Sequence, residues 1–240
     1  MAIITAIIAL GFWAPWIEAW GPSTSFAQRI SLLEWLALEL SRLGLVRFTV
    51  ATPVVIVAAA LVAAIGAVLR VCGTAYLGSG TVNHMEMKAG ALMADGPYRY
   101  VRNPLYLGTW FMVAAMAFIM PPTGALFAMA LITFFLLRLI LGEEVFLTGQ
   151  FGEPYRAYLH AVPRLLPRLR TTLPRAGSKP RRLHAMLAEI NPIGVFVTLA
   201  FLSWSYDNTL MIKAILVSFG ISLVVRALML GVPISANAQE

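Results

Sequence analysis

Long apolar runs alternate with shorter polar stretches along most of the chain. The apolar runs, which carry few charges, are 1–20, 48–69, 104–120, 123–141, 191–206 and 210–229. Each is close to the roughly 20 residues that a helix needs to cross a bilayer. The strict polar–apolar alternation of membrane-spanning β-strands is absent. The pattern therefore predicts an all-α fold, a polytopic transmembrane helical bundle with about six spans.

Local signals refine the ends of these elements. From Ile30 to Leu43, leucines are interrupted by charged residues, which is typical of an amphipathic helix that lies on a membrane surface. Asn103-Pro104 is typical of a helix start, with Asn as the N-cap and Pro at the first helical position. Gly152 and Pro154 predict that one helix ends and another begins at this point.

Composition and charge support the membrane assignment. The chain is 60% hydrophobic and 12% charged, and its mean hydropathy is +0.80, far from the soluble average. Its net charge is +7. No acidic residue lies between Glu153 and Glu189, whereas the basic residues there are Arg156, Arg164, Arg168, Arg170, Arg175, Lys179, Arg181 and Arg182. We interpret this bias as a cytoplasmic connection between spans rather than a nucleic-acid patch.

The chain divides into four regions on this interpretation. They are 1–94 with the first spans and the amphipathic helix, 95–167 as a catalytic core, 168–189 as a basic linker, and 190–240 as a final pair of spans. Both termini then lie in the cytoplasm. Cys72, the only cysteine, excludes an internal disulfide and a cysteine metal cluster, and we expect no metal site.

Polar and aromatic residues gather where several spans return to the cytoplasmic side. They are Tyr98, Arg99, Tyr100, Arg102, Asn103, Tyr106, Arg138, Glu143, Glu144, Tyr155, Tyr158 and Arg164. No Ser/His/Asp set, Walker-type loop or His/Cys ligand pattern is present to indicate hydrolysis or metal chemistry. Paired acids and arginines at a membrane edge favour a pocket that holds a polar cofactor while lipid supplies an apolar partner.

The motifs of this region resemble those of a known family. Gly96 to Gly108, Glu143-Glu144, Phe151 to Tyr155 and Val162-Pro163-Arg164 together resemble the isoprenylcysteine carboxyl methyltransferase family, which is related to bacterial phospholipid N-methyltransferases. The resemblance covers 95–167. It implies S-adenosylmethionine as the methyl donor, bound in a pocket at the cytoplasmic rim. It also implies a multi-pass protein of a bacterial inner membrane, whose active site faces the cytoplasm.

The resemblance also implies roles for individual residues. Arg138 and Glu143 match the residues near the methyl-transfer point. The donor pocket would be lined by Tyr98, Arg102, Asn103, Pro104, Tyr106, Leu107, Gly108, Glu143, Glu144, Tyr155, Tyr158 and Arg164. Asn103 stands where the family usually has His, so an acid–base role there is not supported. Arg138 and Glu143 lie about 140° apart on an ideal helix, so facing one ligand requires a break, for which Gly142 is the candidate.

Other functions fit parts of the same pattern. Sterol-type membrane reductases that use NAD(P)H have a similar Arg-x-Pro-x-Tyr-x-Gly stretch, although the adjacent acids at 143 and 144 favour a methyltransferase. A non-catalytic membrane scaffold does not need so many converging polar groups. The partners expected are membrane lipids and a lipophilic or lipid-anchored substrate. A prenylcysteine carboxylate, a phospholipid amine and a small thiol all remain open as the nucleophile.

Overall fold

The computed structural model describes residues 2–13, 30–77, 94–171, 173–175 and 177–230. Within these ranges the secondary structure is helical, apart from an isolated parallel bridge between Ala94 and Arg175. The α-helices are α1 (Ala2–Trp13), α2 (Leu32–Arg42), α3 (Phe48–Tyr76), α4 (Pro104–Ala117), α5 (Pro122–Phe151), α6 (Glu153–Ala161), α7 (Arg182–Ala188), α8 (Ile190–Val197) and α9 (Asn208–Leu230). The predicted all-α bundle is confirmed.

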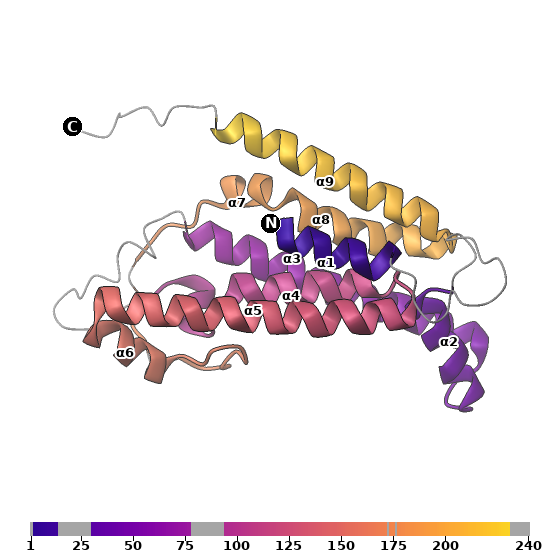
Figure 1. Cartoon of the computed structure of the whole chain (residues 1–240), viewed down its shortest axis with the longest axis horizontal. Helices are drawn as coiled ribbons and strands as arrows, with labels where there is room; N and C mark the ends of the chain where they lie inside the picture. The colour runs from indigo at the N-terminus through magenta and orange to yellow at the C-terminus, as the bar shows by residue number, and fades with distance from the viewer. Residues whose placement is uncertain (1, 14–29, 78–93, 172, 176, 231–240) are drawn as a thin grey trace.

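The long helices run side by side along the longest axis of the molecule (Figure 1). In the described ranges α3, α5 and α9 are long and apolar enough to cross a membrane, and α7 with 190–205 forms a fourth candidate bent by 70°. Helices α1 and α4 are apolar but shorter. The 14 residues of α4 rise only about 21 Å, less than the roughly 30 Å of a hydrocarbon core. The total of six spans remains a prediction.

Large apolar side chains on the outer faces of the helices fit a lipid environment. Leu61 and Val68 on α3, Phe134 on α5 and Val224 on α9 are all more than half exposed. A separate buried core lies between the helices and includes Val113, Ile132 and Leu199. This arrangement, with apolar residues both inside and outside, is expected when the surrounding solvent is a bilayer.

Helix α2 confirms the amphipathic helix expected from residue 30 onward. Ser31 and Glu34 form a reciprocal capping box at its start. Leu33 and Ala37 are buried against the first turns of α3, whereas Trp35 on the opposite face is exposed. The helix lies at the end of the bundle opposite α6 (Figure 1).

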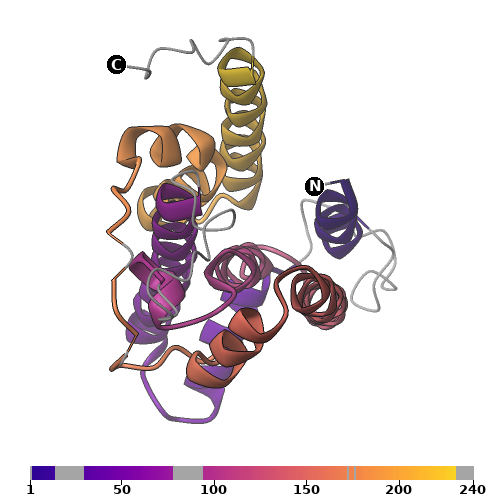
Figure 2. The same cartoon turned by 90° about the vertical axis from the view of Figure 1, so that its left-hand side faces the viewer.

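A sharp turn joins α5 to α6, as the sequence predicts. Gly152 has a φ of 63°, a conformation that glycine adopts without steric cost, and Pro154 lies in the first turn of α6. The chain after α6 then runs back beside residues 95–103 (Figure 2). The amide of Arg102 donates to the Pro163 carbonyl at 2.9 Å, and the amide of Arg168 donates to the Tyr100 carbonyl at 3.0 Å.

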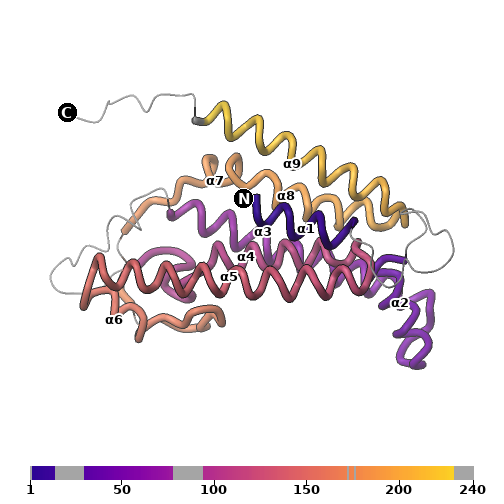
Figure 3. Tube along the Cα trace, in the orientation of Figure 1, coloured from indigo at the N-terminus to yellow at the C-terminus, as the bar shows by residue number. Residues whose placement is uncertain are grey.

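Glycines allow α3 and α4 to approach each other closely. A Cβ placed on Gly66 would lie 3.0 Å from the Met112 backbone nitrogen, and one on Gly108 would lie 3.1 Å from the Arg70 backbone nitrogen. Small residues at such crossings are how membrane helices gain close packing where no hydrophobic effect drives their association. Helices α3 and α4 lie side by side in the bundle (Figure 3). Their close crossing sets the position of Arg70 relative to the first turns of α4.

We predict that Gly66→Leu lowers the free energy of unfolding by about 2 kcal/mol, because the added side chain must push two backbones apart. Reversible unfolding in mixed detergent, followed by circular dichroism, measures this change. Gly142→Ala is the control, since a Cβ there meets nothing within 4 Å. Equal stability of Gly66→Leu and Gly142→Ala would contradict the close crossing.

Candidate functional site

A cavity of about 370 Å³ lies at the α6 end of the bundle. Its volume falls within the range of about 300–1,000 Å³ that is typical of small-molecule sites. The residues that line it are Ile4, Arg70, Leu77, Ala94, Tyr98, Arg102, Asn103, Pro104, Leu105, Tyr106, Thr109, Glu143, Glu144, Leu147, Tyr155 and Tyr158. Helices α1, α3, α4, α5 and α6 all contribute, together with the 3₁₀ turn Gly96–Arg99.

Most of the residues expected in a donor pocket line this cavity. They are Tyr98, Arg102, Asn103, Pro104, Tyr106, Glu143, Glu144, Tyr155 and Tyr158. They come from three separate stretches of sequence, which the returns of the chain bring together at one end of the bundle. Their role in binding a donor remains a prediction.

Three of the expected residues lie outside the cavity lining. Leu107 is half-buried on α4. Gly108 faces α3, where its Cα packs on Arg70. Arg164 holds Glu144 from the chain that follows α6. Their part in the site is therefore to support it rather than to line it.

The structure does not bring Arg138 to the cavity. Its side chain is exposed, and α5 continues without interruption through Gly142, so the predicted break is wrong. An unbroken helix is the expected outcome, because backbone groups in a bilayer have no water with which to replace the helical hydrogen bonds. Arg138 therefore points to a different side of α5 from Glu143.

Glu144 is the centre of a buried ion-pair cluster. One of its oxygens lies 3.1 Å from Nη1 of Arg102, and the other accepts a hydrogen bond from Nη2 of Arg164 at 2.7 Å. The side chains of Glu144 and Arg102 are only 9% and 11% exposed. The hydrogen bonds that Arg164 donates to the Glu144 carboxylate raise the pKa of Arg164. This cluster joins α5, the start of α4 and the chain after α6.

Glu143 differs from its neighbour because its carboxylate has no ion-pair partner among the described residues. The side chain is exposed, lines the cavity and accepts a hydrogen bond from the phenol of Tyr106. Within the described ranges no arginine, lysine or histidine lies within ion-pair distance of it. The cavity therefore presents one negative charge that is available to a cationic ligand.

Neutral aromatic rings form much of the wall. Burial raises the pKa of Tyr155 to about 12, and burial also raises the pKa of Tyr98 and of Tyr158 above the usual value. The Tyr155 and Tyr158 rings lie 6.0 Å apart, and the Tyr158 hydroxyl donates to the Tyr98 carbonyl at 2.8 Å. These phenols remain protonated at neutral pH, and their ring faces are suited to a bound cation.

Asn103 occupies the N-cap position of α4, and Pro104 is the first residue of the helix, as predicted. The side chain of Asn103 nevertheless makes no capping hydrogen bond. Its amide nitrogen instead donates to the Arg164 carbonyl at 3.1 Å. The expected capping role is therefore wrong, and Asn103 ties the start of α4 to the chain after α6.

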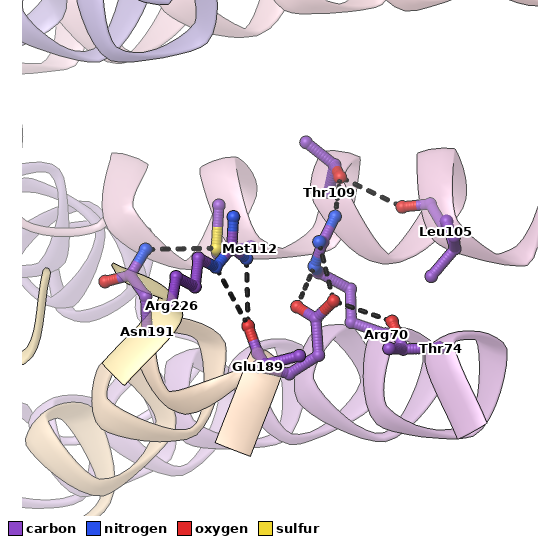
Figure 4. A network of polar contacts seen from close by, with 9 residues as sticks. Arg70, Thr74, Leu105, Thr109, Met112, Glu189, Asn191 and Arg226 are labelled. Atoms are coloured by element: carbon purple, nitrogen blue, oxygen red, sulfur yellow. Dashed lines mark hydrogen bonds and ion pairs between the residues drawn. The ribbon is translucent and has the colours of Figure 1, made fainter. Parts of the chain in front are cut away.

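Sequence reasoning missed Arg70 and Thr109, which also line the cavity. The predicted apolar run 48–69 stops just before Arg70. In the structure α3 continues past Arg70 to Tyr76. The guanidinium of Arg70 forms an ion pair with Glu189 (Figure 4). A charge that interrupts a long apolar helix is the signal that indicates such a site.

The part of the chain that contains most of the cavity lining resembles known methyltransferases. Residues 46–154 match the family profile described as phospholipid methyltransferase. The methanethiol S-methyltransferase of Crocosphaera subtropica is 43% identical over 70 residues, which are 29% of this chain and 27% of that protein. The match thus spans about a quarter of the length of this curated relative. No solved structure matches the chain.

These matches confirm the resemblance drawn from the sequence motifs. They support a membrane methyltransferase of the phospholipid methyltransferase type, and the apolar helices support a multi-pass membrane protein. The profile spans α3, α4, α5 and the start of α6. Helices α7, α8 and α9 lie beyond it.

We predict that Glu144→Gln lowers the free energy of unfolding by about 3 kcal/mol, because Arg102 is left buried without a counter-charge. Unfolding in mixed detergent measures the loss. Glu153→Gln is the matched control: its carboxylate is exposed and pairs with Arg156 at 3.4 Å, so a change below about 0.5 kcal/mol is expected. Similar losses in the two variants would contradict the cluster's structural role.

Proposed function

We propose that the chain is an S-adenosylmethionine-dependent membrane methyltransferase, with the donor bound in the cavity at the α6 end. The observation that carries the proposal is the Glu143 carboxylate, which lines a cavity walled by neutral tyrosines and has no ion-pair partner among the described residues. A cavity of this kind suits a ligand whose reactive centre is a cation. The phospholipid methyltransferase profile over the same segment supports this choice of reaction.

The residues present fit this donor. Its sulfonium and ammonium groups are positive and its carboxylate is negative, so it needs an acid, a cation-binding surface and a hydrogen-bond donor. Glu143 supplies the acid and the rings of Tyr98, Tyr106 and Tyr155 supply the aromatic surface. Arg70 lines the same cavity and carries N–H groups.

S-adenosylmethionine supplies a methyl group that its sulfonium already activates, so the protein has to align a nucleophile and exclude water. Ile4, Leu105 and Leu147 form the apolar part of the wall and reduce the access of water. Glu143 fixes the orientation of the cation. With a thiol nucleophile, the new sulfur–methyl bond forms as the sulfonium–methyl bond breaks, and Glu143 is the acceptor for the thiol proton.

A small thiol is the substrate class that we favour. The cavity is near the lower end of the size range for small-molecule sites, so a donor leaves little room for a bulky second ligand. The methanethiol S-methyltransferase of Crocosphaera subtropica acts, by its name, on such a thiol. A prenylcysteine or a phospholipid would have to leave its apolar tail in the lipid, so that only its carboxylate or amine enters the cavity.

We further propose that the α6 end faces the cytoplasm of a bacterial inner membrane. Arg156, Arg168, Arg170, Arg181 and Arg182 all lie at or after α6 and are exposed. Basic residues in short connections between spans favour the cytoplasmic side. The donor is made in the cytoplasm, so this orientation also gives it direct access to the cavity.

We predict methyl transfer from labelled S-adenosylmethionine to a small thiol, measured in parallel with a prenylcysteine analogue and phosphatidylethanolamine. The donor is also expected to raise the thermal unfolding temperature of the purified protein, whereas NADPH is not. Transfer to one of the other two nucleophiles would support the methyltransferase and replace the thiol as substrate. Stabilisation by NADPH alone would indicate a reductase and overturn the proposal.

We predict that Glu143→Gln weakens the binding of S-adenosylmethionine by about 10- to 100-fold, since a charge-assisted contact is lost inside the cavity. Isothermal titration calorimetry measures this affinity. Glu153→Gln, which removes an equal charge outside the cavity, is expected to bind like the original protein. A uniform weakening in both variants would show a long-range charge effect instead of a contact.

The substitution Arg138→Ala tests whether Arg138 has a different role from Glu143, the other residue that the resemblance places near the methyl-transfer point. Its side chain lies outside the cavity, so donor affinity is expected to be retained. The resemblance places Arg138 near methyl transfer, so loss of turnover with retained donor affinity would support a role in orienting the substrate, whereas unchanged turnover is expected from its position outside the cavity. If donor binding and turnover disappear together, Arg138 is a cofactor-binding or folding residue.

A further inference from the structure

Arg70 is held at the cavity wall by two side chains through three hydrogen bonds. Its Nε and Nη2 donate to the two carboxylate oxygens of Glu189 at 2.6 and 2.9 Å, and its Nη1 donates to Oγ1 of Thr109 at 2.6 Å. Figure 4 shows the guanidinium between α3, α4 and the start of α8. Arginine is always charged and planar, so these contacts fix its orientation as well as its position.

Glu189 is buried where α7 meets α8. Its side chain is only 4% exposed, and it also accepts a hydrogen bond from Oγ1 of Thr74 at 2.7 Å. The bend of 70° between α7 and the following helix brings this carboxylate to α3. Glu189 lies outside both the segment that matches the family profile and the cavity lining, and it holds Arg70, which does line the cavity.

The contacts of Arg70 leave part of its hydrogen-bonding capacity unused. A guanidinium has five N–H groups, and its hydrogen bonds to the described residues use three. One N–H on Nη1 and one on Nη2 therefore remain. Because Arg70 lines the cavity, a ligand with two acceptor oxygens is the natural partner for such a pair of donors.

Charge pairing elsewhere makes Arg70 the candidate for an anionic group. Arg102, the other arginine of the lining, lies against the buried Glu144 carboxylate. Among the described residues of the lining, Glu143 is the acid without an ion-pair partner, and it attracts the cationic part of a ligand. A donor with a cationic centre and a terminal carboxylate can satisfy Glu143 and Arg70 at the same time.

We propose that Arg70 binds the carboxylate of the methyl donor and that Glu189 is the positioning residue that aims its guanidinium. This inference rests on the proposed function, because it takes S-adenosylmethionine as the ligand. The geometry also gives α7 and α8 a part in donor recognition, although they lie beyond the matched segment. The contact is a binding interaction and requires no proton transfer.

The test compares two ligands by calorimetry. S-adenosylhomocysteine keeps the carboxylate, and its decarboxylated analogue lacks only that group. For the original protein we expect the carboxylate to improve affinity about tenfold or more. Arg70→Lys keeps a charge opposite Glu189 but loses the planar fork, and it is expected to remove most of this difference while it leaves the affinity for the decarboxylated ligand unchanged.

Variants of Glu189 test the positioning role. Glu189→Gln loses the two-oxygen contact with Arg70 and is expected to reduce the preference for the carboxylate, whereas Glu189→Asp with its shorter side chain is expected to restore part of it. If Glu189 has a merely structural role, its variants will weaken the binding of both ligands equally, and this result would overturn the proposal. Arg226→Lys, which alters a side chain bonded to the nearby Ala188 carbonyl, is the control for a general disturbance of this region.

The remaining outcomes separate this inference from the proposed function. If the original protein binds both ligands with equal affinity, the donor site stands and the role of Arg70 is wrong. If it binds neither ligand, the proposed function fails and the inference fails with it. If Arg70→Lys raises the KM for a carboxylate substrate and leaves donor affinity unchanged, Arg70 serves the substrate, and the proposal for the donor is overturned.

Discussion

Charges buried at the depth of a bilayer must be paired, and this requirement shapes the α6 end of the molecule. Glu144 and Glu189 are each less than 10% exposed, and each is matched by arginine from another part of the chain. Breaking either pair leaves an uncompensated charge, which costs far more than a surface ion pair contributes. The two clusters therefore fix how α3, α4, α5, α6 and the α7–α8 junction meet.

The same pairing decides which groups remain for a ligand. With Glu144 and Glu189 neutralised, the cavity offers the Glu143 carboxylate and the unused N–H groups of Arg70. The tyrosines of the lining are protonated at neutral pH, as ordinary phenols are, and burial raises the pKa of Tyr98, Tyr155 and Tyr158 further. The site is thus built for a ligand that carries charges of both signs, and the ion-pair clusters serve as its frame.

Much of this could be predicted from the sequence, because short-range signals set the helices. Pro104 and Gly152 mark the start of α4 and the end of α5, and the apolar runs locate the long helices. The direction in which the Arg138 side chain points could not be predicted, because it depends on how α5 is rotated about its axis relative to the neighbouring helices. The break at Gly142 was wrong because one glycine does not interrupt a membrane helix. The Arg70–Glu189 pair joins residues 119 positions apart, which no local pattern reveals.

The Arg70–Glu189 pair links the matched segment to the chain beyond it. The profile ends at residue 154, yet the cavity wall depends on a carboxylate at position 189. Arg70 lies inside the matched segment and needs a buried counter-charge in any related chain that keeps it. The α7–α8 junction therefore supports the cavity indirectly, because without Glu189 the charge of Arg70 has no partner in the described structure.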